Sequence, residues 1–158
     1  MKLYYLQIIL LFTLSLGAQN TTFTNPVLPS GADPYSTYHN GYYYYTNTVG
    51  NKLILWKTKN LAELENAAHK TIWTPPETGM YSKSIWAPEF HIINGKWYVY
   101  FAADNGDNNN HRMYVLENSA EDPFKGEWVF KGKIAANPDR WAIAVSYTHL
   151  TLPTKRIV

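Results

Sequence analysis

The stretch Asn40-Gly41-Tyr42-Tyr43-Tyr44-Tyr45 is followed 54 residues later by a close copy, Asn94-Gly95-Lys96-Trp97-Tyr98-Val99-Tyr100. In both copies an Asn-Gly pair, the strongest short signal for a two-residue hairpin turn, precedes an aromatic run typical of a strand. Each copy also follows a carboxylate beside a proline, in Ala32-Asp33-Pro34-Tyr35 and in Ala87-Pro88-Glu89-Phe90. A supersecondary unit that repeats after about 50 residues predicts blades or an array of small sheets.

The residues around the two hairpins predict two units of about four strands each. The expected strands of the first unit cover residues 33–39, 42–48, 52–58 and 71–73, with a short helical turn over 61–68 that Asn60 caps. Those of the second unit cover residues 89–93, 96–102, 112–117 and 128–131. A third unit begins near Asn137 and does not finish. Four-stranded sheets in series predict an all-β fold of the β-propeller type, and a β-sandwich with two similar hairpins is the alternative.

Composition excludes several classes of function. The chain has 158 residues, no Cys and a formal net charge of +2. The absence of Cys excludes disulfides, thiolate metal sites and cysteine nucleophiles, and the small charge gives no reason to expect a nucleic-acid partner. Aromatic residues make up 16% of the chain, a share that suits strands and also surfaces that bind sugars.

The two ends differ in composition from the rest. Residues 1–18 have a charged start at Lys2, an apolar run and small residues at the end, which is typical of a secretory signal. We therefore expect a secreted or periplasmic protein that is not held in a membrane after signal cleavage. Residues 144–158 fit no blade element and are similar to translated sequencing-adapter bases, so we expect them to be an artefact. The partial propeller is then expected over residues 19–143.

Four motifs together resemble a known family. They are Gly31-Ala32-Asp33-Pro34 with its hairpin, Ile85-Trp86-Ala87-Pro88-Glu89, the strand over 96–100, and Asp139-Arg140-Trp141-Ala142-Ile143. In this order and spacing they resemble glycoside hydrolase family 43, a group of five-bladed β-propellers, over about residues 25–143. The resemblance implies that only two blades and the start of a third are present. The stretches at 101–104 and 111–117 are most similar to α-L-arabinofuranosidase members.

The resemblance implies inverting hydrolysis of a glycosidic bond. A carboxylate base activates water, a carboxylic acid protonates the leaving oxygen, and the two stand roughly 6.5–9.5 Å apart. By resemblance Asp33 is the general base, although an Asp-Pro pair alone also suits a simple turn. A third carboxylate, which keeps the acid protonated by like-charge repulsion, is expected where Ala144 stands. The acid itself belongs to a later blade, and Glu89 does not take its role, so the chain as written is expected to be inactive.

Three further residues are candidates for substrate binding. Trp86 offers an indole face to a sugar ring, or alternatively packs between blades. Glu89 and His91 share one face of a strand, with Phe90 on the other, and either bind substrate or form a polar pair at the blade edge. The loop over 104–111 is rich in oxygen ligands but lacks the spacing of a calcium loop, so we interpret it as a solvent-exposed turn. No cofactor is evident, although calcium occurs in some family members.

The sequence therefore predicts part of an enzyme that removes α-L-arabinofuranosyl units from arabinan or arabinoxylan. A β-xylosidase or an endo-arabinanase of the same family is the alternative within the enzyme class. A carbohydrate-binding propeller without catalysis, and more remotely a structural surface protein, are the alternatives outside it. The expected partner is an oligosaccharide or polysaccharide.

Overall fold

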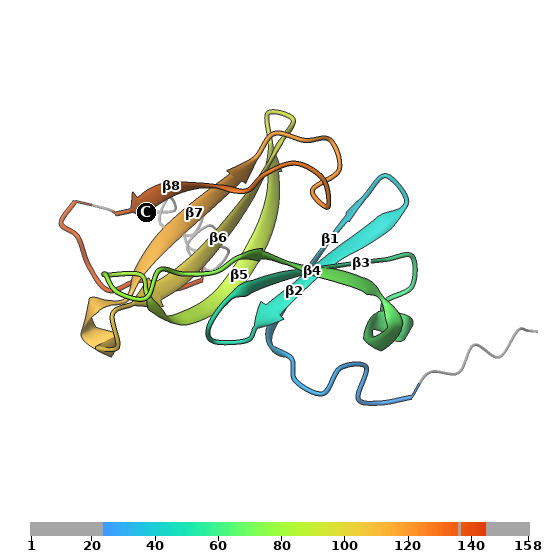
Figure 1. Cartoon of the computed structure of the whole chain (residues 1–158), viewed down its shortest axis with the longest axis horizontal. Coiled ribbons are helices and arrows are strands. Elements are labelled where there is room, and N and C mark those ends of the chain that lie inside the picture. The colour runs from blue at the N-terminus through green and yellow to red at the C-terminus, as the bar shows by residue number, and fades with distance from the viewer. Residues whose placement is uncertain (1–23, 136, 145–158) are drawn as a thin grey trace, which may run out of the picture.

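The protein folds into two antiparallel four-stranded sheets, which Figure 1 shows side by side. The computed structural model describes residues 24–135 and 137–144. The first sheet contains β1 (Ala32–His39), β2 (Tyr42–Thr48), β3 (Leu53–Thr58) and β4 (Ala68–Trp73), in that order. The second contains β5 (Lys83–Ile93), β6 (Lys96–Asp104), β7 (Arg112–Asn118) and β8 (Val129–Ile134), again in chain order. Within these described residues no helix has the length and hydropathy needed to cross a membrane.

Both predicted hairpins are confirmed. His39 pairs with Tyr42 and Ile93 pairs with Lys96, so each turn has two residues. The Asn-Gly residues of both turns have positive φ angles: 48° and 80° in the first turn, and 51° and 76° in the second. Two successive positive angles define the turn whose twist matches that of the flanking strands, and Asn-Gly adopts it at least cost.

The predicted strands are found, but several of them extend beyond the expected bounds, three of them most clearly. β5 begins at Lys83 instead of 89, β4 begins at Ala68 instead of 71, and β8 ends at Ile134 instead of 131. The short helix η1 (Leu61–Asn66) is present, and the Asn60 side chain accepts a hydrogen bond from Ala62 N–H as predicted. The predicted third unit near 137 forms no strand within the described residues up to 144.

The two carboxylate-proline segments form the same backbone bulge. In β1 the residues Asp33 and Pro34 are inserted between the pairs Ala32–Thr48 and Tyr35–Thr46. In β5 the residues Ala87 and Pro88 are inserted in the same way, between the pairs that Trp86 and Glu89 make with β6. The residue before each proline has a left-handed φ, 50° at Asp33 and 45° at Ala87. Bulges remove the ladder hydrogen bond that a proline cannot donate, which is why the strands continue through Pro34 and Pro88.

This register corrects the simple repeat suggested by the sequence. Asp33 and Ala87 each lie seven residues before the Asn of their turn, so they occupy equivalent places. Glu89 is therefore equivalent to Tyr35 and not to Asp33. The two carboxylates come from different positions of the repeat.

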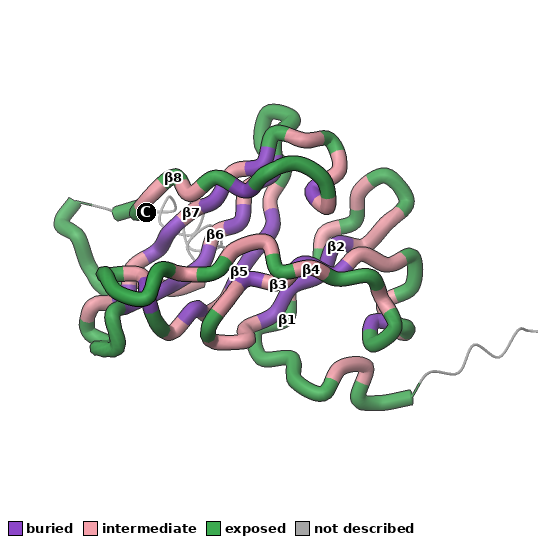
Figure 2. The backbone as a smooth tube through the Cα atoms, in the orientation of Figure 1, coloured by how far each residue is buried: buried purple, intermediate pink, exposed green. Residues whose placement is uncertain are grey.

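The main core lies between the two sheets. Tyr44, Leu53 and Leu55 of the first sheet pack against residues of the second that include Phe90 and Trp97. Figure 2 shows buried backbone concentrated in β2, β3, β5, β6 and β7, with the turns exposed. The Thr37 hydroxyl donates to the Phe90 carbonyl at 2.9 Å and thereby ties β1 to β5. The first strands of the two sheets, β1 and β5, are therefore fixed side by side, and we call them the inner strands.

The second face of the first sheet carries a smaller cluster. Tyr45, Trp56 and Leu64 are buried there, against the segment that precedes β1 and against η1. Tyr44 and Tyr45 therefore lie on opposite faces of β2. The tyrosine run is therefore a strand whose rings alternate between the two faces of the sheet.

The interface between the sheets makes a stability prediction. Phe90→Ala removes a side chain that is 1% exposed, and we expect a loss of about 3–5 kcal/mol in the free energy of unfolding. Ile92→Ala, in the same strand but 38% exposed, is the matched control and should cost about 1 kcal/mol or less. Urea unfolding followed by circular dichroism measures both. Equal losses for the two variants would show that the sheets do not pack as described.

Candidate active site

Asp33 and Glu89 meet at a small cavity between the two inner strands. The cavity, which we name the Asp33 cavity, has a volume of about 170 Å³. Its lining residues are Asp33, Pro34, Tyr35, Ala87, Pro88, Glu89 and Ala144. It is smaller than the roughly 300–1,000 Å³ of complete small-molecule sites, as expected where only two sheets supply walls.

A threonine hydroxyl links the two bulges that form this cavity. Thr48 Oγ1 accepts a hydrogen bond from Ala87 N–H at 2.8 Å and donates one to Asp33 Oδ2 at 2.7 Å. The hydroxyl can do both at once because it has one proton and two lone pairs. The exposed Asp33 carboxylate is therefore oriented by the second sheet, through Thr48.

Ala144 reaches the same cavity because the segment before it docks on the second sheet. The Trp141 indole N–H donates to the Asn108 carbonyl at 2.9 Å, and Ala142 N–H donates to the His111 carbonyl at 3.3 Å. Arg112 Nε lies 2.8 Å from Asp139 Oδ1 and adds an ion pair. The position at which sequence resemblance expects a third carboxylate is thus beside Asp33 and Glu89.

Glu89 and His91 form a pair on one face of β5. Glu89 is 5% exposed, and its Oε2 lies 3.3 Å from His91 Nε2. The His91 ring also contacts the rings of Tyr35 and Tyr100, at centroid distances of 5.6 and 5.5 Å. Phe90 points into the core, so the predicted alternation along β5 is confirmed. Glu89 lines the Asp33 cavity, whereas His91 contacts Glu89 without lining the cavity itself.

Trp86 adjoins the cavity without lining it. It is half-buried, and its indole stacks on the imidazole of His111 with ring centroids 4.3 Å apart and an angle of 24° between the planes. A bulge lies on each side of Trp86 in the pairing of β5 with β6. The structure therefore brings Asp33 of β1 close to the stretch of β5 that carries Trp86, Glu89 and His91.

The loop over 104–111 differs from the sequence prediction at both ends. Asp104 is 1% exposed and His111 is fully buried, so the prediction of a solvent-exposed turn is wrong for these two residues. Only the residues between them are accessible, and they include the short helix η2 (Asn108–Asn110). Sequence reasoning missed this pair because it depends on the approach of Trp86 and Ser84 from β5. Within residues 24–135 and 137–144 no three His, Asp or Glu side chains gather where a metal ion could bind.

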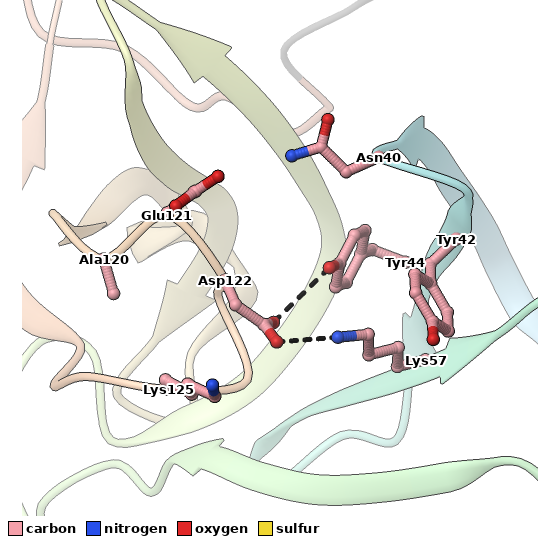
Figure 3. A pocket seen from close by; sticks show the side chains of 8 residues that line it. All are labelled: Asn40, Tyr42, Tyr44, Lys57, Ala120, Glu121, Asp122 and Lys125. Carbon is pink, nitrogen blue, oxygen red and sulfur yellow. Dashed lines mark hydrogen bonds and ion pairs between the residues drawn. The ribbon is translucent and has the colours of Figure 1, made fainter.

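A second cavity, of about 260 Å³, lies beside the turn that joins the end of β1 to β2 (Figure 3). We name it the Lys57 cavity, and its lining residues are Asn40, Tyr42, Tyr44, Lys57, Ala120, Glu121, Asp122 and Lys125. Lys57 Nζ lies 2.6 Å from Asp122 Oδ2 and 4.4 Å from the centroid of the Tyr42 ring. The Tyr44 hydroxyl donates to Asp122 Oδ1 at 3.4 Å. These charges are paired with one another across the two sheets, which makes the cavity a junction between them.

The contacts at this junction lower the pKa of the Asp122 carboxyl. Partial burial opposes its ionisation, but hydrogen bonds from Lys57 Nζ and from Phe124 N–H outweigh the burial. Together they hold the pKa of Asp122 below its ordinary value of 3.8. The pKa of Lys57 is affected in the complementary way: burial lowers it, and the hydrogen bonds to Asp122 and Tyr44 raise it above 10.5 overall.

Two successive four-stranded meanders, with inner strands side by side and a carboxylate at the mouth between them, define a pair of propeller blades. The sequence profile of glycosyl hydrolases family 43 matches residues 23–151, and the chain belongs to this family. An extracellular exo-α-(1→5)-L-arabinofuranosidase of Streptomyces avermitilis is 47% identical over 123 residues, which are 75% of this chain and 26% of that protein. The corresponding enzyme of Streptomyces chartreusis is 40% identical over 132 residues.

The solved structures agree with this assignment. The crystal structure of an α-L-arabinofuranosidase from Lactobacillus brevis superimposes with a TM-score of 0.69 at 40% identity, covering 77% of this chain and 41% of that one. The fold is thus all-β and of the five-bladed propeller family, with two blades described, as the sequence predicted. The chain spans 26% and 40% of the lengths of the two Streptomyces relatives.

The junction at the Lys57 cavity predicts a pH dependence. Because the folded pKa of Asp122 lies below 3.8, its stabilisation is fully present above that pH and is lost as the pH falls through the folded pKa. Asp122→Asn should therefore lower the free energy of unfolding at pH 7, and its difference from the unchanged chain should shrink below pH 3.8. Urea unfolding at pH 7 and pH 3 measures this.

The matched control for Asp122 removes its partner. In a Lys57→Met background the same Asp122→Asn change should show a much smaller dependence on pH. A difference between the unchanged chain and Asp122→Asn that stays constant down to pH 3 would contradict the ion pair.

Proposed function

We propose that the protein containing these blades is an inverting glycoside hydrolase that releases α-L-arabinofuranosyl units. The observation that carries the proposal is the identity of 47% and 40% to proteins named as exo-α-(1→5)-L-arabinofuranosidases. The family model matches residues 23–151, a range that includes all the segments that form the Asp33 cavity. The natural substrates are then arabinan or the side chains of arabinoxylan.

In this proposal Asp33 is the general base. Its carboxylate stands at the mouth between two inner strands and accepts a hydrogen bond from Thr48, which fixes its direction. A fixed carboxylate at a cavity can take the proton of an attacking water, and such proton transfer contributes about 10²–10⁴ to a rate. Inversion then requires an acid on the opposite side of the sugar, from a blade that this segment does not supply.

Glu89, His91 and Trp86 take substrate-binding roles in the proposal. The buried Glu89 lines the Asp33 cavity, and its contact with His91 orients it. Trp86 offers a flat apolar surface beside the same cavity. The β-xylosidase and endo-arabinanase activities are less supported, because a solved α-L-arabinanase and a solved β-xylosidase/α-arabinofuranosidase share the fold at only 20% and 13% identity. A binding propeller without catalysis is the remaining alternative.

The cellular location is also part of the proposal. Residues 1–18 carry the pattern of a secretory signal, and the two Streptomyces relatives are named extracellular. Export fits a substrate that is a polysaccharide of plant cell walls. The predicted signal and, after Ala144, the tail that we expect to be an artefact lie outside the described residues, and both stay predictions.

The role of Asp33 is tested in a chimera, because the chain spans only part of its relatives. Residues 24–143 of this chain replace the matching segment of the Streptomyces avermitilis relative, which supplies the remaining blades. We expect this chimera to hydrolyse 4-nitrophenyl α-L-arabinofuranoside with inversion. NMR of the released sugar determines the configuration of the product. Asp33→Asn should then lower kcat by at least about 100-fold.

Glu127→Gln is the matched control for Asp33, because Glu127 is an exposed carboxylate of the same blades. It should keep the activity of the unmodified chimera. A correctly folded chimera without activity would contradict the proposed function. Full activity in Asp33→Asn would contradict the role of the base alone.

Ala144 gives an independent prediction. A chimera extended by one residue, so that Ala144 replaces the residue of the relative, should lose at least about 100-fold in kcat/KM. Ala144→Asp in the extended chimera should restore the activity, since this position lies in the Asp33 cavity. If Ala144 is tolerated without loss, the third carboxylate does not belong at this position.

A further inference from the structure

His111 is a buried titratable residue to which the proposed reaction gives no role. It is fully buried, and Asp104 beside it is 1% exposed. Both residues lie at the ends of the loop that connects β6 to β7. Two polar side chains at such depth need partners, because an unpaired buried charge is strongly destabilising.

The partners of His111 fix its ring on two sides. Nδ1 lies 2.9 Å from Asp104 Oδ2, although the two groups are not aligned as a regular hydrogen bond. Nε2 lies 3.2 Å from the carbonyl oxygen of Ser84. The backbone carbonyl of His111 accepts from Ala142 N–H. The imidazole is therefore contacted by groups from two separate segments of the chain, and a third segment holds the His111 backbone.

The flat face of this ring carries Trp86. The centroid distance of 4.3 Å and the angle of 24° describe a stacked pair, the closest approach of any two rings in the described residues. Stacked aromatic pairs are stabilising beyond the area that they bury. One face of the Trp86 indole is thus covered by His111, while the side chain remains half-exposed.

Trp86 needs such a support because its backbone does not fix its direction. The residues Ser84 and Ala87 have positive φ angles of 51° and 45°, and a bulge lies on each side of Trp86. Regular strand alternation is interrupted at both points, so strand geometry by itself leaves the orientation of the indole undetermined. The stacking on His111 supplies the missing constraint.

We propose that the Asp104–His111 pair positions Trp86 as the sugar-stacking platform of the Asp33 cavity. Asp104 holds the imidazole, and the imidazole holds one face of the indole, so that the exposed part of the indole is presented to an arabinofuranosyl ring. Asp104 and His111 are positioning residues and do not touch the substrate. The inference rests on the proposed function and extends it to the residues that preorganise binding.

The test uses the chimera of residues 24–143, with kcat and KM measured on α-1,5-arabinobiose. His111→Ala removes the support and should raise KM by about tenfold while kcat changes by less than about threefold, because uniform binding is lost. The double variant Asp104→Asn/His111→Phe keeps a flat ring and leaves no unpaired charge. It should return KM to within about threefold of the unmodified chimera.

Trp128→Phe is the matched control for loss of stability. Trp128 is also buried and contacts Phe90, with ring centroids 5.7 Å apart, but it lies outside the Asp33 cavity. It should lower the melting temperature and leave KM unchanged. If His111→Ala behaves in the same way, the pair is only structural and the proposal is wrong.

A second measurement separates this inference from the proposed function. In the 158-residue chain, ¹⁵N labelling of tryptophan gives six indole signals, and Trp86→Phe identifies one of them. His111→Ala should shift or broaden that signal, whereas Trp128→Phe should leave it in place. An unchanged Trp86 signal in His111→Ala overturns the positioning role even if the chimera shows no hydrolysis.

Discussion

The structure depends on the burial of aromatic and aliphatic side chains between its two sheets. Neither sheet can cover its own apolar face, so Tyr44 and the Leu residues of β3 pack against Phe90 and Trp97. This contact also brings β1 and β5 side by side, where the Thr37 hydroxyl joins them. The meeting of Asp33 and Glu89 at one cavity is a consequence of that packing.

The site is built on irregular backbone that regular strands support. Both inner strands insert an X-Pro pair as a bulge, and the residue before each proline has a left-handed φ. Left-handed residues other than glycine are uncommon and persist where surrounding contacts hold them. Here the hydroxyl of Thr48 holds both bulges, since it bonds Ala87 N–H and the Asp33 carboxylate together. The left-handed backbone at the two bulges and the direction of the Asp33 carboxylate are therefore held by the same hydroxyl.

Much of the fold could be predicted from local signals. The Asn-Gly pairs set two-residue turns, alternation placed Tyr44 and Tyr45 on opposite faces, and the repeat of 54 residues gave two similar sheets. Asp33 and Trp86 became candidate site residues through motifs that resemble a family. The burial of Asp104 and His111 could not be predicted in this way. Their loop is polar in sequence, and only contacts with Ser84, Trp86 and Ala142 make its ends part of the core.

The sequence by itself determined the turns, the strand order and the family, because these depend on residues close together along the chain or on motifs in a fixed order. The tertiary structure decided which side chains meet. Asp33, Glu89 and Ala144 share a cavity although more than 50 residues separate each from the next. Their convergence follows from packing between sheets and from docking of the 139–144 segment, which are long-range contacts that no local pattern encodes.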